Sequence, residues 1–147
     1  MKRYRFLFAG SGGQGVITAA IILAEAAVLY EDINAVQSQS YGAAARGGIT
    51  RSDVIISDSE IHFPKVNQPN FLICLNQESY NKYYQIIRPG GILLSDSHFV
   101  QIQQRAEAQQ INLPLYQSVI QEIGDPIVLN ICMLGALQAL TLLISFN

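Results

Sequence analysis

A glycine-rich turn is the first feature of the chain whose residue types could do chemistry. It reads GSGGQG over residues 10–15 and matches the G-x-G-x-x-G pattern. Aromatic and apolar residues 4–9 predict a strand before it, and residues 16–30 predict a helix after it. A helix N-terminus offers unpaired N–H groups and partial positive charge, so the turn could bind a phosphate or a carboxylate. Alternatively, the glycines serve only the tight packing of helix on strand.

A dinucleotide site would require one residue more. An acidic side chain should close the second strand, about 20 residues further on, to bind the ribose hydroxyls. The second predicted strand, residues 34–38, ends in Gln37 and Ser38, while Glu31 and Asp32 precede it. The sequence therefore disfavours a dinucleotide site. A stand-alone nucleotide-binding oxidoreductase or regulator stays open as an alternative function.

A second glycine cluster, SYGAAARGG, occupies residues 40–48. Its Arg46 is followed by two glycines, so a guanidinium and bare backbone N–H groups could meet one phosphate or carboxylate. The same arginine could instead pair with a partner subunit. Tyr41 could stack on a cofactor ring, although filling an interface pocket is favoured. In the first cluster, Ser11 and Gln14 either bind a ligand or cap the helix, and for Ser11 the cap is the simpler role.

Several short segments of the sequence, taken together, match the pattern of one protein family. QSYG at 39–42, RGG at 46–48 and RSD at 51–53 together resemble the gamma subunit of the 2-oxoacid:ferredoxin oxidoreductases. The related indolepyruvate oxidoreductase beta subunit shares much of this pattern, so the 2-oxoacid stays open. Four further segments in the right order carry the resemblance along most of the chain: GSGGQGV (10–16), IHFP (61–64), RPGGILL (88–94) and NICMLGA (130–136).

The resemblance implies a division of labour within an enzyme complex. Enzymes of this kind oxidise pyruvate, 2-oxoglutarate or branched 2-oxoacids with thiamine diphosphate, coenzyme A and ferredoxin. Alpha- and beta-type subunits would hold the thiamine diphosphate, and cluster-bearing domains or a ferredoxin-like delta subunit would carry the electrons. This chain would be a non-catalytic subunit, inactive alone, that packs against them and shapes the approach of coenzyme A. A pure scaffold without ligand contact is the other reading.

The candidate binding residues are those of the two glycine clusters. No residue is assigned a catalytic role, because Glu78, Asp96 and Glu122 have no visible carboxylate partner for acid–base work. No metal site is expected either. The cofactor-contacting candidates are Gly10, Gly12, Gly13, Gln14, Gly15, Tyr41, Gly42, Arg46, Gly47 and Gly48.

Composition limits the classes of partner. The 147 residues predict one domain, 1–147, and half of them are hydrophobic, enough for a sizeable core. Only 14% are charged, which favours a buried partner interface, and a net charge of −2 without a basic run gives no footprint for nucleic acid. Compared with the family it resembles, the chain is expected to lack the last C-terminal helical segment.

The two cysteines, Cys74 and Cys132, lie far apart among apolar neighbours and are interpreted as small core residues. Without a C-x-x-C pair, neither zinc nor an iron–sulfur cluster is expected on this chain. His62 and His98 have no companion at ligand spacing, so surface or hydrogen-bonded roles are favoured. Cysteine usage and the lack of a signal peptide suggest the cytoplasm.

One segment has the length of a membrane span. Residues 127–146 carry no charge over 20 positions. Polar residues interrupt the segment, however, and no basic flank or aromatic belt follows it. A buried or interface helix is therefore favoured, and no membrane partner is expected.

The remaining chain alternates strand and helix patterns. Strands are expected at 49–57, 70–75, 92–95 and 111–113, and helices at 78–87, 115–123 and from Pro126 onward. This alternation predicts a three-layer, Rossmann-like α/β fold with a mostly parallel sheet and helices on both faces. Residues 60–63 are expected to form a short antiparallel return. The two glycine clusters should then share the edge at the carboxyl ends of the strands, where open α/β sheets bind ligands.

Overall fold

The computed structural model describes residues 3–40, 49–103 and 106–142. Four α-helices and six strands follow in the described parts, with 3-10 turns at Gly12–Gln14, Tyr84–Ile86 and Pro126–Val128. The strands are β1 (Arg3–Gly10), β2 (Asn34–Ser40), β3 (Thr50–Ser57), β4 (Phe71–Cys74), β5 (Ile92–Asp96) and β6 (Gln109–Leu113). The helices are α1 (Val16–Glu31), α2 (Gln77–Tyr83), α3 (Leu115–Glu122) and α4 (Leu129–Thr141).

The strands form one sheet in the order β2-β3-β1-β4-β5-β6. β1, β4, β5 and β6 pair in parallel, whereas β3 pairs antiparallel with both β1 and β2. Five strands therefore run in one direction and β3 alone runs in the other. The expected mostly parallel α/β sheet is confirmed.

The antiparallel strand is not where the sequence placed it. Residues 60–63 form no strand, and Glu60, His62 and Phe63 are exposed. β3 takes that role because its Val54, Ile55 and Ile56 are buried and it pairs with β1 along eight residues. The prediction of a return at 60–63 was wrong because β3 already fills the antiparallel position beside β1, and three of these four residues are exposed.

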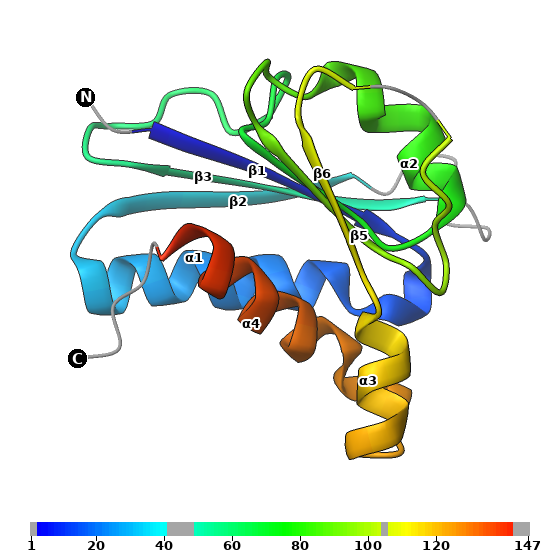
Figure 1. The fold of residues 1–147 in the computed structure, drawn as a ribbon. Coiled ribbons are helices and arrows are strands. Elements are labelled where there is room, and N and C mark those ends of the chain that lie inside the picture. Colours follow the sequence, from blue (N-terminus) through cyan, green and yellow to red (C-terminus); the bar gives the residue numbers. More distant parts are fainter. Residues whose placement is uncertain (1–2, 41–48, 104–105, 143–147) are drawn as a thin grey trace.

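Helices cover both faces of the sheet, as Figure 1 shows, with α1, α3 and α4 on one side and α2 on the other. The side chains of β1 explain this division, since they alternate between the faces. Phe6 and Phe8 pack into the cluster that contains residues of α1 and α4, whereas Leu7 packs with Tyr80 of α2. The expected three layers are confirmed.

The outer surface of the helix layer remains unusually apolar. Leu29 and Tyr30 at the end of α1 are 73% and 71% exposed, and Ile131 of α4 is half exposed. A helix that is apolar on all sides is typical of one that is covered on all sides. Within the described residues, none of the helices combines the length and the hydropathy that a membrane span requires. The uncharged segment at 127–146 contains α4, whose Leu129, Met133 and Leu137 are buried.

Candidate functional site

The glycine turn lies at the carboxyl edge of the sheet, together with the roots of the second glycine cluster. β1 ends at Gly10, which pairs with Thr50 at the start of β3, and Ser40 at the end of β2 pairs with Arg51. Residues 40 and 50, at the two ends of the second cluster, therefore lie at the same edge of the sheet as the first turn. The second cluster itself, including Tyr41, Gly42, Arg46, Gly47 and Gly48, lies outside the described residues.

Gln14 is engaged within the turn. Its side-chain Oε1 accepts the backbone N–H of Ser11 at 2.8 Å, and its Nε2 donates to the carbonyl of Leu75 at 2.7 Å. Leu75 follows β4, so the amide fastens the turn to the neighbouring strand. The sequence left ligand binding and helix capping open for Gln14. In the structure its side chain forms hydrogen bonds within the protein, as a cap does.

Gly15 is required by the fold itself. Its φ is +75°, a region that side-chain-bearing residues rarely adopt. A Cβ at this position would lie 2.7 Å from Nδ2 of Asn130, which is 8% exposed and donates to the Gly15 carbonyl at 3.3 Å. The contact packs the start of α1 on α4. Gly10 is similarly enclosed, with Gln14 Oε1 only 2.6 Å from a Cβ placed there.

Gly12 and Gly13 differ from these two glycines. Neither has a positive φ. A Cβ at Gly13 would meet no described residue within 4 Å, and one at Gly12 would meet only Thr50 Oγ1, at 3.9 Å. Nothing within the described structure therefore demands glycine at these two positions. They expose bare backbone directly before α1, where a helix leaves N–H groups without partners.

Arg51 and Asp53 form a buried ion pair close to this edge. The Arg51 Nε lies 2.8 Å from Asp53 Oδ1, and the two side chains are 13% and 4% exposed. Asp53 Oδ2 also accepts the N–H of Val66 at 2.9 Å, and the guanidinium lies 5.2 Å from the Tyr83 ring centroid. This ion pair attaches the segment around Val66 to the sheet. The RSD motif at residues 51–53 therefore has a structural role here.

Asp96 was not recognised from the sequence as a structural residue. It is fully buried at the end of β5, and its two oxygens accept the N–H groups of His98 and Tyr116, both at 2.9 Å. Burial raises the pKa of the Asp96 carboxyl, and these two hydrogen bonds oppose the rise. The D-S-H sequence is a turn signal that could have indicated the first bond, but the second depends on a residue 20 positions away.

We expect Asp96→Asn to destabilise the chain by about 1–3 kcal/mol, because an amide NH₂ would face one of the two backbone donors. A raised folded-state pKa means that the folded chain binds this proton more tightly than the unfolded chain. The contribution of Asp96 thus decreases as pH rises through its folded pKa. Urea unfolding at several pH values should show a larger difference from the parent chain near pH 4 than at pH 7. A difference that widens toward neutral pH would contradict this.

The two cysteines occupy apolar surroundings, as expected. Cys74 is fully buried, and burial raises the pKa of its thiol to about 12, so it is not a reactive thiolate at neutral pH. Cys132 is half-buried at the edge of the core, and burial, followed by the charge of Asp96, raises its pKa. Within residues 3–40, 49–103 and 106–142, no group of three or more His, Cys, Asp or Glu could hold a metal ion.

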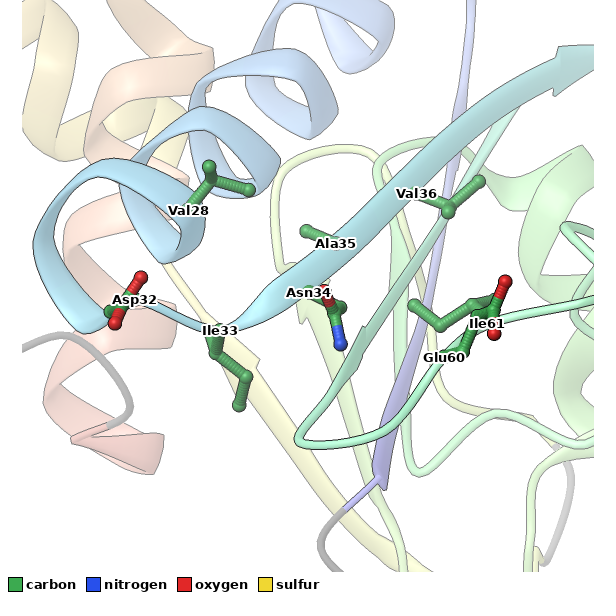
Figure 2. Close-up of a pocket in the computed structure, with 8 residues that line it drawn as sticks. All are labelled: Val28, Asp32, Ile33, Asn34, Ala35, Val36, Glu60 and Ile61. Carbon is green, nitrogen blue, oxygen red and sulfur yellow. The ribbon is translucent and has the colours of Figure 1, made fainter.

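A cavity of about 380 Å³ lies at the amino-terminal end of β2, away from the glycine turn (Figure 2). The charged residues that line it are Asp32 and Glu60, which would repel an anionic cofactor. It is roughly 20 Å from the carboxyl end of β2, counting about 3.3 Å per residue from Asn34 to Ser40. The remaining lining residues are Val28, Ile33, Asn34, Ala35, Val36 and Ile61. The cavity is therefore separate from the glycine edge.

Fold and site together define a three-layer α/β protein with an open glycine turn at the carboxyl edge of its sheet. The sequence model of the pyruvate ferredoxin/flavodoxin oxidoreductase family matches residues 5–147. The chain is 46% identical to the 2-oxoglutarate synthase subunit KorC of Methanocaldococcus jannaschii, over 97% of this chain and 78% of that protein. The chain belongs to the pyruvate ferredoxin/flavodoxin oxidoreductase family.

Solved structures agree with this assignment. The gamma subunit of a keto/oxoacid ferredoxin oxidoreductase from Geobacter sulfurreducens superposes with a TM-score of 0.89 and 41% identity, covering 99% of this chain and 79% of that one. The fold also occurs in a 2-oxoglutarate:ferredoxin oxidoreductase from Magnetococcus marinus, with a TM-score of 0.83 and 22% identity over 26% of that longer chain. The chain is thus a gamma-type subunit of a 2-oxoacid:ferredoxin oxidoreductase, and the resemblance inferred from its motifs is confirmed.

Proposed function

We propose that the complex containing this chain oxidises 2-oxoglutarate. The supporting observation is the 46% identity to a subunit named for 2-oxoglutarate synthase, over nearly the whole chain. The reaction would join the decarboxylated acyl group to coenzyme A, release CO₂ and pass two electrons to ferredoxin. Substrate choice would rest with the thiamine-binding partner subunits, since this chain supplies no catalytic residue in the proposal.

The partners are alpha- and beta-type subunits, with a ferredoxin-like delta subunit as a further candidate. They would hold the thiamine diphosphate and the iron–sulfur clusters, and we place the assembly in the cytoplasm, in keeping with two free cysteines. The apolar outer surface of α1 and α4, with Leu29, Tyr30 and Ile131 exposed, supports a covered interface.

Within this assembly, the glycine edge would be the surface that coenzyme A approaches. Gly12 and Gly13 would provide the close-approach backbone, since no described neighbour explains their lack of a side chain. Gly10, Gln14 and Gly15 would shape the turn by their internal contacts.

Arg46 would supply the charge that meets the coenzyme's phosphates, with Tyr41, Gly42, Gly47 and Gly48 beside it. The position of Ser40 and Thr50 at the same edge of the sheet as the glycine turn supports this arrangement. When bound, coenzyme A supplies the thiol that accepts the acyl group. The residues of this chain would only bind and orient it. If the chain were a scaffold alone, its glycine edge would contact a subunit and no coenzyme.

Arg46→Ala should raise the KM for coenzyme A in the assembled complex by about tenfold or more, with a smaller effect on kcat, because a charge-assisted phosphate contact is worth about 1.5–3 kcal/mol. The measurement is the initial rate of ferredoxin reduction against coenzyme A concentration. Lys82→Ala, which removes an exposed lysine of α2, is the matched control. If a fully assembled Arg46→Ala complex showed unchanged kinetics, Arg46 would not contact coenzyme A, and the role of a scaffold without ligand contact would be favoured instead.

A further inference from the structure

A basic cavity of about 300 Å³ lies at the amino-terminal end of β1, away from the glycine turn. Four of the chain's nine lysine and arginine residues line it, although the whole chain has a net charge of −2. No acidic side chain is among its lining residues. The polar residues that line it are Arg3, Arg5, Lys65, Asn67, Gln68 and Arg88. Positive charge is therefore concentrated at this one place.

The backbone around the cavity is rigidly positioned. Asn70 accepts the N–H of Arg5 through its side chain at 2.9 Å and donates its own N–H to the Arg5 carbonyl at 2.9 Å. The N–H of Arg88 donates to the Pro69 carbonyl at 2.9 Å, and the Arg88 carbonyl accepts from Gly91 at 2.9 Å. The backbones of these two lining arginines are thus hydrogen-bonded to adjacent residues, 69 and 70.

Among the described residues, none of the side chains that line this cavity is a carboxylate. Arg3 donates to the hydroxyls of Ser57 and Ser59 and to the carbonyl of Glu60, all neutral acceptors. The Nε of Arg88 is buried and has no hydrogen-bond partner among the described residues. Burial, and then the charges of Arg88 and Arg3, lower the pKa of Arg5. The Arg88 side chain is thus held at the cavity without an internal acceptor for its Nε, and the mutual repulsion of the three arginines would be relieved by a bound anion.

We propose that this basic cavity binds the phosphate group of a small molecule. A phosphate carries up to two charges and presents acceptor oxygens in several directions, which suits cations that converge from β1, from the segment at 65–68 and from Arg88. The volume is at the low end for ligand pockets, so it accommodates a phosphate or diphosphate group. Arg5 is five residues from Gly10, roughly 17 Å along β1, so this site is distinct from the proposed coenzyme edge.

Calorimetric titration of the full chain with inorganic pyrophosphate tests the proposal, at constant ionic strength set with chloride. We expect saturable binding that weakens tenfold or more in Arg88→Gln and Arg5→Gln. Lys82→Gln removes the same charge from an exposed position of α2 and should change the affinity less than twofold. Arg5→Lys keeps the charge but loses the forked donor, so it should weaken binding several-fold while preserving the fold.

Citrate, a carboxylate of comparable charge, separates phosphate recognition from general anion attraction. We expect it to bind at least tenfold more weakly than pyrophosphate. The proposal is overturned if pyrophosphate does not bind at millimolar concentration, if citrate binds equally well, or if Lys82→Gln weakens binding as much as Arg88→Gln. Thermal unfolding of each variant without ligand ensures that lost binding is not lost folding.

Discussion

Gly15→Ala should lower the free energy of unfolding by about 2–4 kcal/mol, which corresponds to a decrease in Tm of about 5–15 °C. Two causes add. Alanine is strained at a φ of +75°, and its Cβ would lie 2.7 Å from Nδ2 of Asn130, forcing α1 away from α4. Urea unfolding followed by circular dichroism measures the change.

Gly13→Ala is the matched control within the same turn. Its φ is not positive and its Cβ would meet no described residue within 4 Å, so the change in stability should stay within about 0.5 kcal/mol. If Gly15→Ala proved as harmless as Gly13→Ala, the contact between the turn and α4 would not hold the fold as described. The pair thereby separates a glycine required for folding from one available for approach by another molecule.

Asp53→Ala should destabilise the chain by about 3–5 kcal/mol, because it leaves the Arg51 guanidinium largely buried without its anion. It also removes the acceptor for the N–H of Val66. The exposed carboxylate of Glu122, removed by Glu122→Ala, provides a comparison that should change stability by less than about 0.5 kcal/mol.

A double variant distinguishes a coupled pair from two independent residues. Arg51→Met combined with Asp53→Leu removes both charges, so its cost should be clearly smaller than the summed costs of Arg51→Met alone and Asp53→Leu alone. Additive costs in equilibrium unfolding would show that the two side chains do not depend on each other.

Much of the fold follows from local patterns. The alternation of apolar strands with helices predicted the strands of the parallel half and all four helices, and Gly124, with a φ of +85°, ends α3 where expected. The insertion of β3 between β1 and β2 could not be predicted, since it depends on pairing between residues about 50 positions apart. In residues 60–63, Ile61 and Phe63 alternate with polar residues as in a strand, but the segment forms no strand.

For the site as well, features that depend on neighbouring residues were predictable, and contacts between residues far apart in the sequence were not. The glycine turn and its position between strand and helix were evident from the sequence. The internal role of Gln14 was not decidable, because its partner Leu75 is 61 residues away, and Gly15 contacts Asn130 across 115 residues. Both partners lie in segments without any local mark of that contact. The open surroundings of Gly13 likewise emerge only from the three-dimensional structure.

The most direct test of the proposed function is to isolate a tagged form of this chain from its own cells and to assay the proteins that co-purify with it. The measurement is coenzyme A-dependent reduction of ferredoxin with 2-oxoglutarate, pyruvate or 2-oxoisovalerate as substrate. We predict recovery of thiamine-binding subunits and a rate with 2-oxoglutarate at least tenfold above the other two. A chain that purifies alone, or a complex that prefers another 2-oxoacid, would contradict the proposed function.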